Sequence, residues 1–456
     1  MKRAIGAASA ALLTVVGVAL VAPQAQASSR TIVVSPHGTV TLQQAVDKLK
    51  RHGGGTVLLR GGDYRQRVAI KGAHDITIAP WHGAHPVLDG KGLTVPATDA
   101  GVVAIRNSNH IVVRGLEITG YRTSKLNHVP IGIYLTGHDR DVRIAHNHVH
   151  HMGNYNTTKG SFNLNAHGIA AYGDDPAKPI TKLVITHNVV DHLHLGASES
   201  VVVNGNVTHW QITHNHIYDN NNIGIDAIGF EPTIGGKQRY SSVNRARYGK
   251  IAHNTVHNIK SRGNPSYWED GQWCNCADGI YVDGGTHIRI AHNHVTRSDI
   301  GIEVAAENGR GNASHVVVAH NRISGSRFVG ITTGGYCDNH PGCGGVQTGK
   351  SFDNVFRYNT LRNDNTLNDG SPELLIQYHA HHNTFVHNTI TATDSAHAVY
   401  GTVPRSDSSH NRSDYNRFAA KGGSRHSAEF GWQKHTYTGF GTYRQATGQD
   451  AHSTFG

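Results

Sequence analysis

A short pattern that recurs eight times constrains the fold of this chain more than any other feature. In each copy an alternating apolar segment ends in His-Asn, or once in Tyr-Asn, as in "VRIAHNHV" at 142, "WQITHNHI" at 210 and "IRIAHNHV" at 288. Alternation with a period of two predicts strands, and short strands recurring with no helical pattern between them predict a β-solenoid. The asparagines of successive copies are 27 to 41 residues apart, so one coil takes about 28 residues and the longer steps carry insertions.

A second strand in each coil opens with Gly-Ile. The pairs begin at Gly132, Gly168, Gly224, Gly279, Gly301 and Gly330. The isoleucine is predicted to point into the coil, so the residue after it points outward. We expect the asparagine of His-Asn to adopt a left-handed corner and to stack as a hydrogen-bonded ladder. Its histidine neighbour is expected at a corner or on the surface rather than on a metal.

The segment before the repeats predicts a cap for the solenoid. Leu42, Ala45, Val46 and Leu49 have helical spacing, and three consecutive glycines follow before an alternating strand begins. A short amphipathic helix at this place would cover the apolar core and the strand edge of the first coil.

Together, the expected helix followed by "TVLLRGGDY" and the serial "I-x-HN-x-V" and "GI" strands resemble the pectate-lyase-like right-handed parallel β-helix superfamily. The resemblance covers about residues 35 to 418. It implies an all-β fold, a single right-handed parallel β-helix (β-solenoid) of roughly 10–12 coils with an N-terminal capping helix. We expect this domain over 28–418 and a C-terminal cap or tail over 419–456. Members of that superfamily are mostly extracellular enzymes that cut polysaccharides, with a minority of epimerases and of binding or structural proteins.

The first residues predict export. Lys2 and Arg3 precede an apolar run and then Ala25-Gln26-Ala27, which is the pattern of a secretory signal peptide over 1–27. No later apolar stretch has the length of a spanning helix. We therefore expect a secreted, soluble, extracellular protein with no membrane partner.

Four cysteines, Cys274, Cys276, Cys337 and Cys343, fit an exported protein with disulfides. Four cysteines allow three pairings, and the sequence does not choose among them. Their spacing matches no common zinc-binding pattern.

The chain carries a formal net charge of +10. A basic exported protein can attract anionic polymers. Its lysines and arginines are scattered rather than clustered, however, so we expect no nucleic-acid partner.

Aligning the Gly-Ile pairs gives an outward column of side chains: Tyr134, Ala170, Asp226, Tyr281, Glu303 and Thr332. Asp283 lies two residues beyond Tyr281 on the same face. Asp278 opens the same strand, and Glu231 and Glu307 follow the neighbouring strands. Like charges stacked across a sheet destabilise it, so an acidic cluster without a structural reason predicts a functional site.

Two insertions, 230–248 and 260–277, are predicted to rise beside this face and to wall a cleft with aromatic rings that stack on sugars. We expect the catalytic residues to be Asp283, Glu303, Asp226 and Asp278. The residues expected to bind substrate are Glu231, Tyr281, Glu307, Trp268, Trp273 and Arg247.

These residues predict a glycoside hydrolase acting on a poly- or oligosaccharide. Asp283 and Glu303 form a diagonal pair, two residues apart along adjacent strands, which corresponds to roughly 8 Å. Inverting glycosidases hold their carboxyl groups about 6.5 to 9.5 Å apart, so inversion is favoured. Such a hydrolase requires no cofactor.

Two alternatives use the same surface. A polysaccharide lyase would hold Ca²⁺ on Asp226, Asp278, Asp283 and Glu303 and remove a proton from a polyuronide. Its base would be one of Arg245, Arg247, Lys250 or Tyr281. A non-catalytic β-helix protein would bind carbohydrate without cleaving it.

Overall fold

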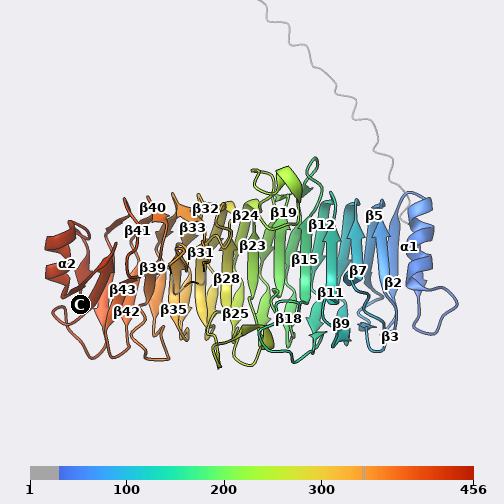
Figure 1. Ribbon diagram of the computed structural model, residues 1–456. Helices are drawn as coiled ribbons and strands as arrows, with labels where there is room; N and C mark the ends of the chain where they lie inside the picture. The colour runs from blue at the N-terminus through green and yellow to red at the C-terminus, as the bar shows by residue number, and fades with distance from the viewer. Residues whose placement is uncertain (1–29, 341–342, 344) are drawn as a thin grey trace, which may run out of the picture.

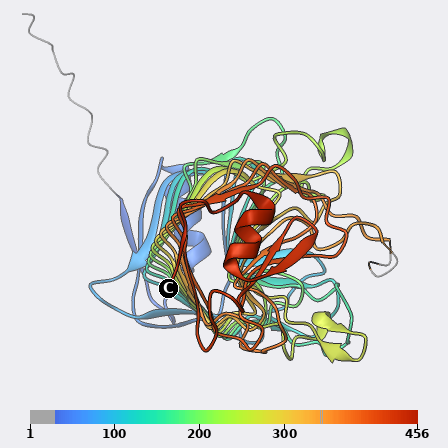
Figure 2. The ribbon, with the colours of Figure 1, turned by 90° about the vertical axis from the view of Figure 1, so that its left-hand side faces the viewer.

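The computed structural model describes residues 30–340, 343 and 345–456. These residues form an elongated stack of coils whose strands line up into three long sheets, with an α-helix at each end (Figure 1). Viewed along the stack, successive coils nearly superimpose (Figure 2). The fold is the expected right-handed parallel β-helix. The signal peptide expected over 1–27 lies outside the described residues.

The first sheet, sheet A, contains the strands that precede each His-Asn, and all of its pairings are parallel. Its eighteen strands are β1 (Thr31–Val34), β2 (Gly55–Leu59), β5 (His74–Pro80), β8 (Asn109–Arg114), β12 (Arg140–Ala145), β16 (Ile180–Thr181), β17 (Val184–Thr186), β20 (Val207–Thr208), β21 (Gln211–Thr213), β24 (Arg247–Ala252), β29 (Thr286–Ala291), β32 (Asn312–Ser314), β33 (Val317–Ala319), β36 (Lys350–Phe352), β37 (Val355–Arg357), β40 (Ala380–His381), β41 (Thr384–Val386) and β44 (Arg412–Asp414).

Sheet B follows the His-Asn corner and is also parallel. Its thirteen strands are β3 (Gly62–Tyr64), β6 (Pro86–Asp89), β9 (Glu117–Thr119), β13 (His148–His150), β18 (Val189–Asp191), β22 (His216–Tyr218), β25 (Thr255–His257), β30 (His294–Thr296), β34 (Arg322–Ser324), β38 (Thr360–Arg362), β42 (Thr389–Ala392), β45 (Arg417–Ala420) and β48 (Thr454–Phe455).

Sheet C contains the Gly-Ile strands and is parallel up to its last pair, β46 and β47, which is antiparallel. Its thirteen strands are β4 (Val68–Lys71), β7 (Asp99–Arg106), β11 (Val129–Thr136), β15 (His167–Gly173), β19 (Val201–Gly205), β23 (Ile225–Ile228), β28 (Asp278–Asp283), β31 (Ile300–Ala305), β35 (Val329–Thr333), β39 (Leu374–Ile376), β43 (Ala398–Thr402), β46 (Glu429–Trp432) and β47 (His435–Thr438).

Smaller elements lie in the loops and at the ends. Helix α1 (Leu42–Arg51) begins with a capping box between Thr41 and Gln44 and buries its apolar side chains against the first coils. Helix α2 (Phe440–Thr447) lies across the C-terminal end (Figure 2). Because β46 and β48 extend sheets C and B, solenoid strands continue beyond residue 418. The loops add η1 (Gly236–Gln238), η2 (Pro265–Tyr267) and the pairs β10 (Arg122–Thr123) with β14 (Gly153–Asn154) and β26 (Trp268–Glu269) with β27 (Gln272–Trp273).

The asparagines of the repeat form the expected ladder. From Asn147 to Asn416, each side-chain Nδ2 donates to Oδ1 of the asparagine in the next coil, at 3.0 to 3.2 Å. The left-handed residue, however, is the histidine and not the asparagine, as at His292 with φ 59°. The left-handed corner turns the histidine outward, while the next residue faces inward, where the ladder satisfies its buried amide.

The outward histidines stack on one another at the corner between sheets A and B. His253 and His292 are representative, since their ring centroids are 5.1 Å apart and their planes differ by 4°. The stack extends through other coils with the same parallel geometry, and tyrosines replace histidine at some places. Most of the histidines in the repeat are therefore scaffold, as the sequence predicts.

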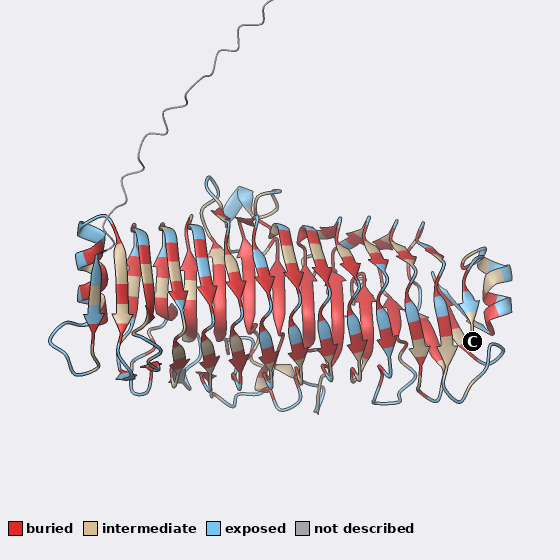
Figure 3. Ribbon diagram, turned by 180° about the vertical axis from the view of Figure 1, so that it is seen from behind, coloured by how far each residue is buried: buried red, intermediate tan, exposed pale blue. Residues whose placement is uncertain are grey.

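The core runs the length of the stack between the three sheets. Ile280, Val282, Ile290 and Val295 of one coil are fully buried, and equivalent residues of other coils continue the same cluster. Figure 3 shows strands that are mostly buried along the stack, with exposed residues concentrated at turns and at the ends.

Two disulfides join cysteines that are close in sequence, Cys274 with Cys276 and Cys337 with Cys343. This is one of the three pairings that the sequence left open. Among the described residues, no helix is long and apolar enough to cross a membrane.

Candidate active site

A break in the in–out alternation at the start of the sheet C strands sets which side chains reach the outer face. A Cβ built on Gly279 would lie 2.4 Å from Cγ1 of Val295 in the core and 2.8 Å from the carbonyl oxygen of Gly301. Gly279 and Ile280 therefore both face inward, in place of strict alternation. The preceding side chain, Asp278, lines the groove on the outer face together with Tyr281 and Asp283.

The strand register brings the predicted acidic column together. Tyr281 pairs with Asp226 of β23 on one side and with Glu303 of β31 on the other. The column differs from the prediction at one position, because β19 adds a coil and places Val202 between Ala170 and Asp226.

The outer face of sheet C forms a groove of about 920 Å³ above these strands. Loops on both sides supply its walls. The described residues that line it include nine acidic side chains, namely Glu199, Asp226, Glu231, Glu269, Asp278, Asp283, Glu303, Glu307 and Asp369. No lysine, arginine or histidine is among the described residues that line it.

The carboxyl groups at the floor of the groove are buried and in contact. Asp226 and Asp278 are 2% exposed, and Asp283 is 4% exposed. The side chains of Asp278 and Glu303 share a hydrogen bond, so one of the two carries a proton. Oδ1 of Asp283 accepts a hydrogen bond of 2.7 Å from the backbone N–H of Glu307. Within the described chain, Oδ1 of Asp226 and Oδ1 of Asp278 accept no hydrogen bond.

Burial and mutual repulsion raise the pKa values of these acids. Desolvation, and then the charge of Glu307, raise the pKa of Glu303 to about 8, although its hydrogen bond with Asp278 opposes the shift. Desolvation, with the charges of Glu231 and Glu199, raises the pKa of Glu307 to about 7. The pKa values of Asp226, Asp278 and Asp283 are raised well above their usual range, first by desolvation. The cluster therefore retains protons at neutral pH.

A chain of polar groups that the repeat pattern does not reveal adjoins the groove, where Tyr172 and Glu199 line it. Oη of Tyr172 lies 3.0 Å from Nε2 of His167, and Nδ1 of His167 lies 3.3 Å from Oε2 of Glu199. His167 is 3% exposed. The charge of Glu199 is the strongest charge effect on the pKa of Asp226, after desolvation, so this chain of groups adjoins the acidic column.

A sequence signal for Glu199 existed but was incomplete. Ile169 pairs with Val201, so Ser200 stands where other coils have the glycine of Gly-Ile. Glu199 therefore occupies the pre-glycine position, which is turned outward as in Asp278. A search for the Gly-Ile pair alone does not find this coil.

The predicted substrate-binding residues separate into two groups. Glu231, Tyr281, Glu307 and Trp273 line the groove. Trp268 and Arg247, which are also predicted to bind substrate, are not among the described residues that line the groove. Trp268 packs edge-on against Trp273 and holds the Lys159 ammonium 3.5 Å from its ring centroid.

The basic side chains considered for proton abstraction lie elsewhere. Arg247 donates to Oδ1 of Asn206 at 2.8 Å and to backbone carbonyls, and Arg245 donates to the carbonyl of Gly285 at 2.9 Å. Lys250 lies on β24 of sheet A, while the groove lies over sheet C. Of the four residues considered as base, Tyr281 alone is among the described groove-lining residues.

Comparison with known proteins relates this chain to one relative and to several solved structures. No model of a known protein family matches the chain. The lacto-N-biosidase of family GH136 from Eubacterium ramulus superimposes with a TM-score of 0.50 at 12% identity, over 90% of this chain and 63% of that chain. The A-module of the mannuronan C-5 epimerase AlgE6 from Azotobacter vinelandii gives a TM-score of 0.48 at 15% identity, over 91% and 92%. These similarities concern the fold alone.

The relative in sequence is the uncharacterized protein YwoF of Bacillus subtilis strain 168. The two are 32% identical over 420 residues, which cover 91% of this chain and 83% of that protein. An alignment of this length spans nearly the whole solenoid, including sheet C. This right-handed parallel β-helix chain therefore belongs to the same protein family as YwoF of Bacillus subtilis.

Proposed function

We propose that this protein is an exported glycoside hydrolase that cleaves a poly- or oligosaccharide in the acidic groove of sheet C. The observation that carries the proposal is the buried carboxyl cluster on β23, β28 and β31, in which Asp226, Asp278 and Glu303 are 2%, 2% and 6% exposed. Glycosidases need one carboxylic acid that holds a proton at working pH and one carboxylate that does not.

Glu303 is the general acid in this proposal. Its pKa of about 8 keeps it protonated at neutral pH, so it can donate a proton to the oxygen of the leaving sugar. The adjacent carboxyl of Asp278 holds Glu303 in place and exchanges the proton with it.

Asp283 is the general base. Burial and then the charge of Glu307 raise its pKa, while the backbone N–H of Glu307, 2.7 Å from Oδ1, favours its ionised form, so Asp283 acts as base once it has lost its proton. Asp283 pairs with Ala305, two residues beyond Glu303, so the two acids are diagonal neighbours roughly 8 Å apart. That separation leaves room for a water molecule and supports inversion at the anomeric carbon.

The charge of the groove favours a neutral or amino-bearing sugar. Nine acidic side chains line it, without a lysine, arginine or histidine among the described lining residues. A polyuronide would meet repulsion unless cations came with it. Tyr267, Trp273 and Tyr281 offer rings on which an uncharged sugar face can stack.

The two disulfides support an oxidising, extracellular location. The lacto-N-biosidase that shares the fold is named as a glycoside hydrolase. That name is compatible with the proposal and does not specify the sugar.

A calcium-dependent lyase is the second candidate function. The oxygens Oδ1 of Asp226 and Asp278, which accept no hydrogen bond from the described residues, are suitable ligands for Ca²⁺. The bound ion would then offset the repulsion of a uronide, and Tyr281 would be the base. A third candidate, non-catalytic carbohydrate binding, requires no proton transfer.

A screen of neutral, amino-bearing and uronic polysaccharides separates the three. Reducing ends and ultraviolet absorbance would be measured with and without a chelator. A hydrolase gives new reducing ends without absorbance and is indifferent to the chelator. A lyase gives absorbing products and stops when the cation is removed, and a binding protein gives neither signal.

Variants locate the activity in the groove. Glu303→Gln and Asp283→Asn are each expected to lower kcat at least about 100-fold, because each removes a proton-transfer group. The matched control is Glu373→Gln, which replaces a buried carboxyl beside sheet C that burial keeps protonated, with a pKa of about 11, and that is not among the described lining residues. Equal activity in Glu303→Gln and Glu373→Gln would refute the assignment.

A further inference from the structure

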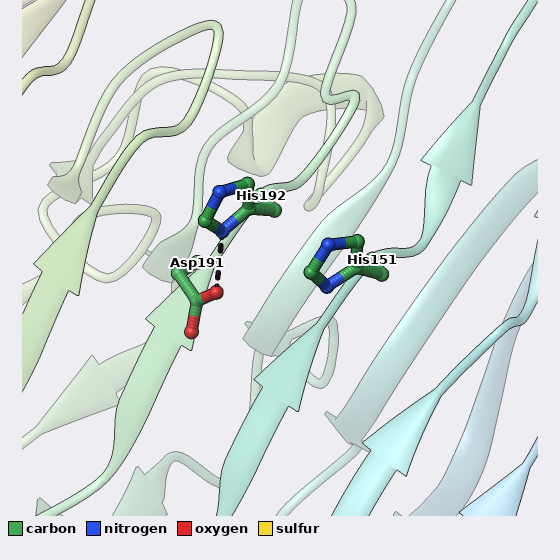
Figure 4. Close-up of side chains that lie close together, drawn as sticks. All are labelled: His151, Asp191 and His192. Carbon is green, nitrogen blue, oxygen red and sulfur yellow. Dashed lines mark hydrogen bonds and ion pairs between the residues drawn. The ribbon is translucent and has the colours of Figure 1, made fainter.

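A group of imidazoles and one carboxylate lies at the corner where sheet B begins to turn toward sheet C. His148 and His150 belong to β13, His151 follows it, and Asp191 ends β18 with His192 next in sequence. His150 pairs with Asp191 in the strand register, so His151 and His192 occupy matching corners of adjacent coils. Figure 4 shows His151, Asp191 and His192 gathered at this corner.

The contacts of Asp191 hold its carboxylate in a fixed orientation. Oδ2 lies 2.6 Å from Nδ1 of His192, and Oδ1 lies 2.6 Å from Nε2 of His148. Asp191 is 3% exposed, whereas His151 and His192 are exposed. The buried carboxylate of Asp191 therefore lies between the imidazoles of His148 and His192.

The imidazole of His151 contacts two others: it stacks on His192, and its ring nitrogen Nδ1 lies close to that of His150. The rings of His151 and His192 stack with centroids 4.7 Å apart and planes 6° apart. Nδ1 of His150 lies 2.7 Å from Nδ1 of His151. Since two ring nitrogens at that distance leave room for one proton between them, at least one of them presents a lone pair.

One ligand atom from each of His151, Asp191 and His192 lies within 4.8 Å of the others. Two imidazole nitrogens with one carboxylate oxygen form a donor set that suits Zn²⁺ and neighbouring divalent transition metals. His148 would act as an outer partner, because its hydrogen bond orients the carboxylate.

A second cluster, His379, His381 and Asp407, is less suitable. The backbone N–H and Nδ1 of His379 both bind Asp407, at 2.7 and 2.8 Å, and Nε2 of His379 contacts the Gln347 amide at 2.7 Å. The Asp407 side chain is 45% exposed, so water solvates this carboxylate more than it solvates Asp191, which is 3% exposed.

We propose that His151, Asp191 and His192 bind one divalent transition metal ion, with Zn²⁺ as the expected occupant and water completing its coordination. The ion would link two adjacent coils at the corner beyond sheet B. The site is separate from the groove of sheet C and does not depend on the proposed hydrolase activity.

The test uses the full protein without a histidine tag, stripped of metal by a chelator that is then removed. Titration calorimetry with zinc chloride at neutral pH is expected to show one tight site above a weak background from other surface histidines. Co²⁺ added in equimolar amount is expected to give visible absorption typical of nitrogen and oxygen ligands in low coordination.

The double variant His151→Ala, His192→Ala is expected to weaken Zn²⁺ binding at least 100-fold, because it leaves Asp191 as the only ligand. A matched double variant, His253→Ala, His292→Ala, removes two stacked histidines from the left-handed corners of adjacent coils and should retain the tight site. Both substitutions are at exposed positions, and circular dichroism checks the fold. Absence of a tight site, or equal loss in both variants, overturns the proposal.

Discussion

In strand β28 some residues pack in the core and others face the groove of the candidate site. Ile280 and Val282 are fully buried in the core, while Asp278, Tyr281 and Asp283 face the groove. The acids on this face are unfavourable for the fold, because burial raises their pKa values and they repel one another. Such an arrangement is expected where a site requires it.

Neutralising one of these acids should stabilise the folded protein at alkaline pH. The pKa of Glu303 rises from 4.5 to about 8 on folding. The stability linked to its proton is therefore fully present below about pH 4.5 and lost as the pH rises through about 8. Because the amide of Glu303→Gln does not ionise, this variant should lose less stability than the wild type between pH 5 and pH 9.

Thermal or urea unfolding across that range measures the effect, which amounts to about 1.4 kcal/mol for each unit of pKa difference. A surface substitution such as Glu269→Gln provides the control, because Glu269 is exposed. Identical pH profiles for wild type and Glu303→Gln would show that Glu303 ionises normally in the folded state.

At the scale of the element, the glycine that opens each sheet C strand determines which side chain before it faces the groove. Gly224, Gly279 and Gly301 each lie against a core side chain of sheet B and a carbonyl of the next coil, with no space for a Cβ. With the glycine facing inward, the preceding residue faces outward, and this brings Asp278 into the groove.

Gly279→Ala tests whether this position requires a residue without a Cβ. The added Cβ would lie 2.4 Å from Val295 and 2.8 Å from a backbone oxygen, so the strand must shift. We expect a destabilisation of about 1–3 kcal/mol, measured by urea unfolding, together with loss of activity as Asp278 moves. Gly235→Ala is the control, because a Cβ there meets no atom within 4 Å. An active, equally stable Gly279→Ala variant would contradict the role of this glycine.

The repeat pattern of the strands determines which parts of the fold and of the site could be predicted from the sequence. The His-Asn repeat and the register of Asp226, Tyr281 and Glu303 were predictable, because period-two alternation and parallel stacking fix them. Glu199 was not found, since Ser200 replaces the marker glycine in its coil. Contacts between loops and the groove were beyond prediction, because local packing with Lys159 and Trp273, and not sequence spacing, decides where Trp268 lies.

At the scale of the whole molecule, a basic chain contains an acidic groove. The formal net charge is +10, yet the groove is lined by nine acids without a basic residue among the described lining positions. The solenoid allows this separation because each coil contributes one short strand to sheet C, so residues far apart in sequence form a single polar face. The corner between sheets A and B contains the asparagine ladder and the histidine stacks that hold the coils in register.

The most direct test of the central claim is mass spectrometry of the products formed in water enriched in ¹⁸O. With a polysaccharide on which the wild type is active, hydrolysis at the groove predicts saturated products that carry one ¹⁸O at the new reducing end. Under the same conditions Glu303→Gln should give no such products, while Glu373→Gln should give them at the wild-type rate. Unsaturated products without ¹⁸O, or undiminished turnover by Glu303→Gln, would contradict the account.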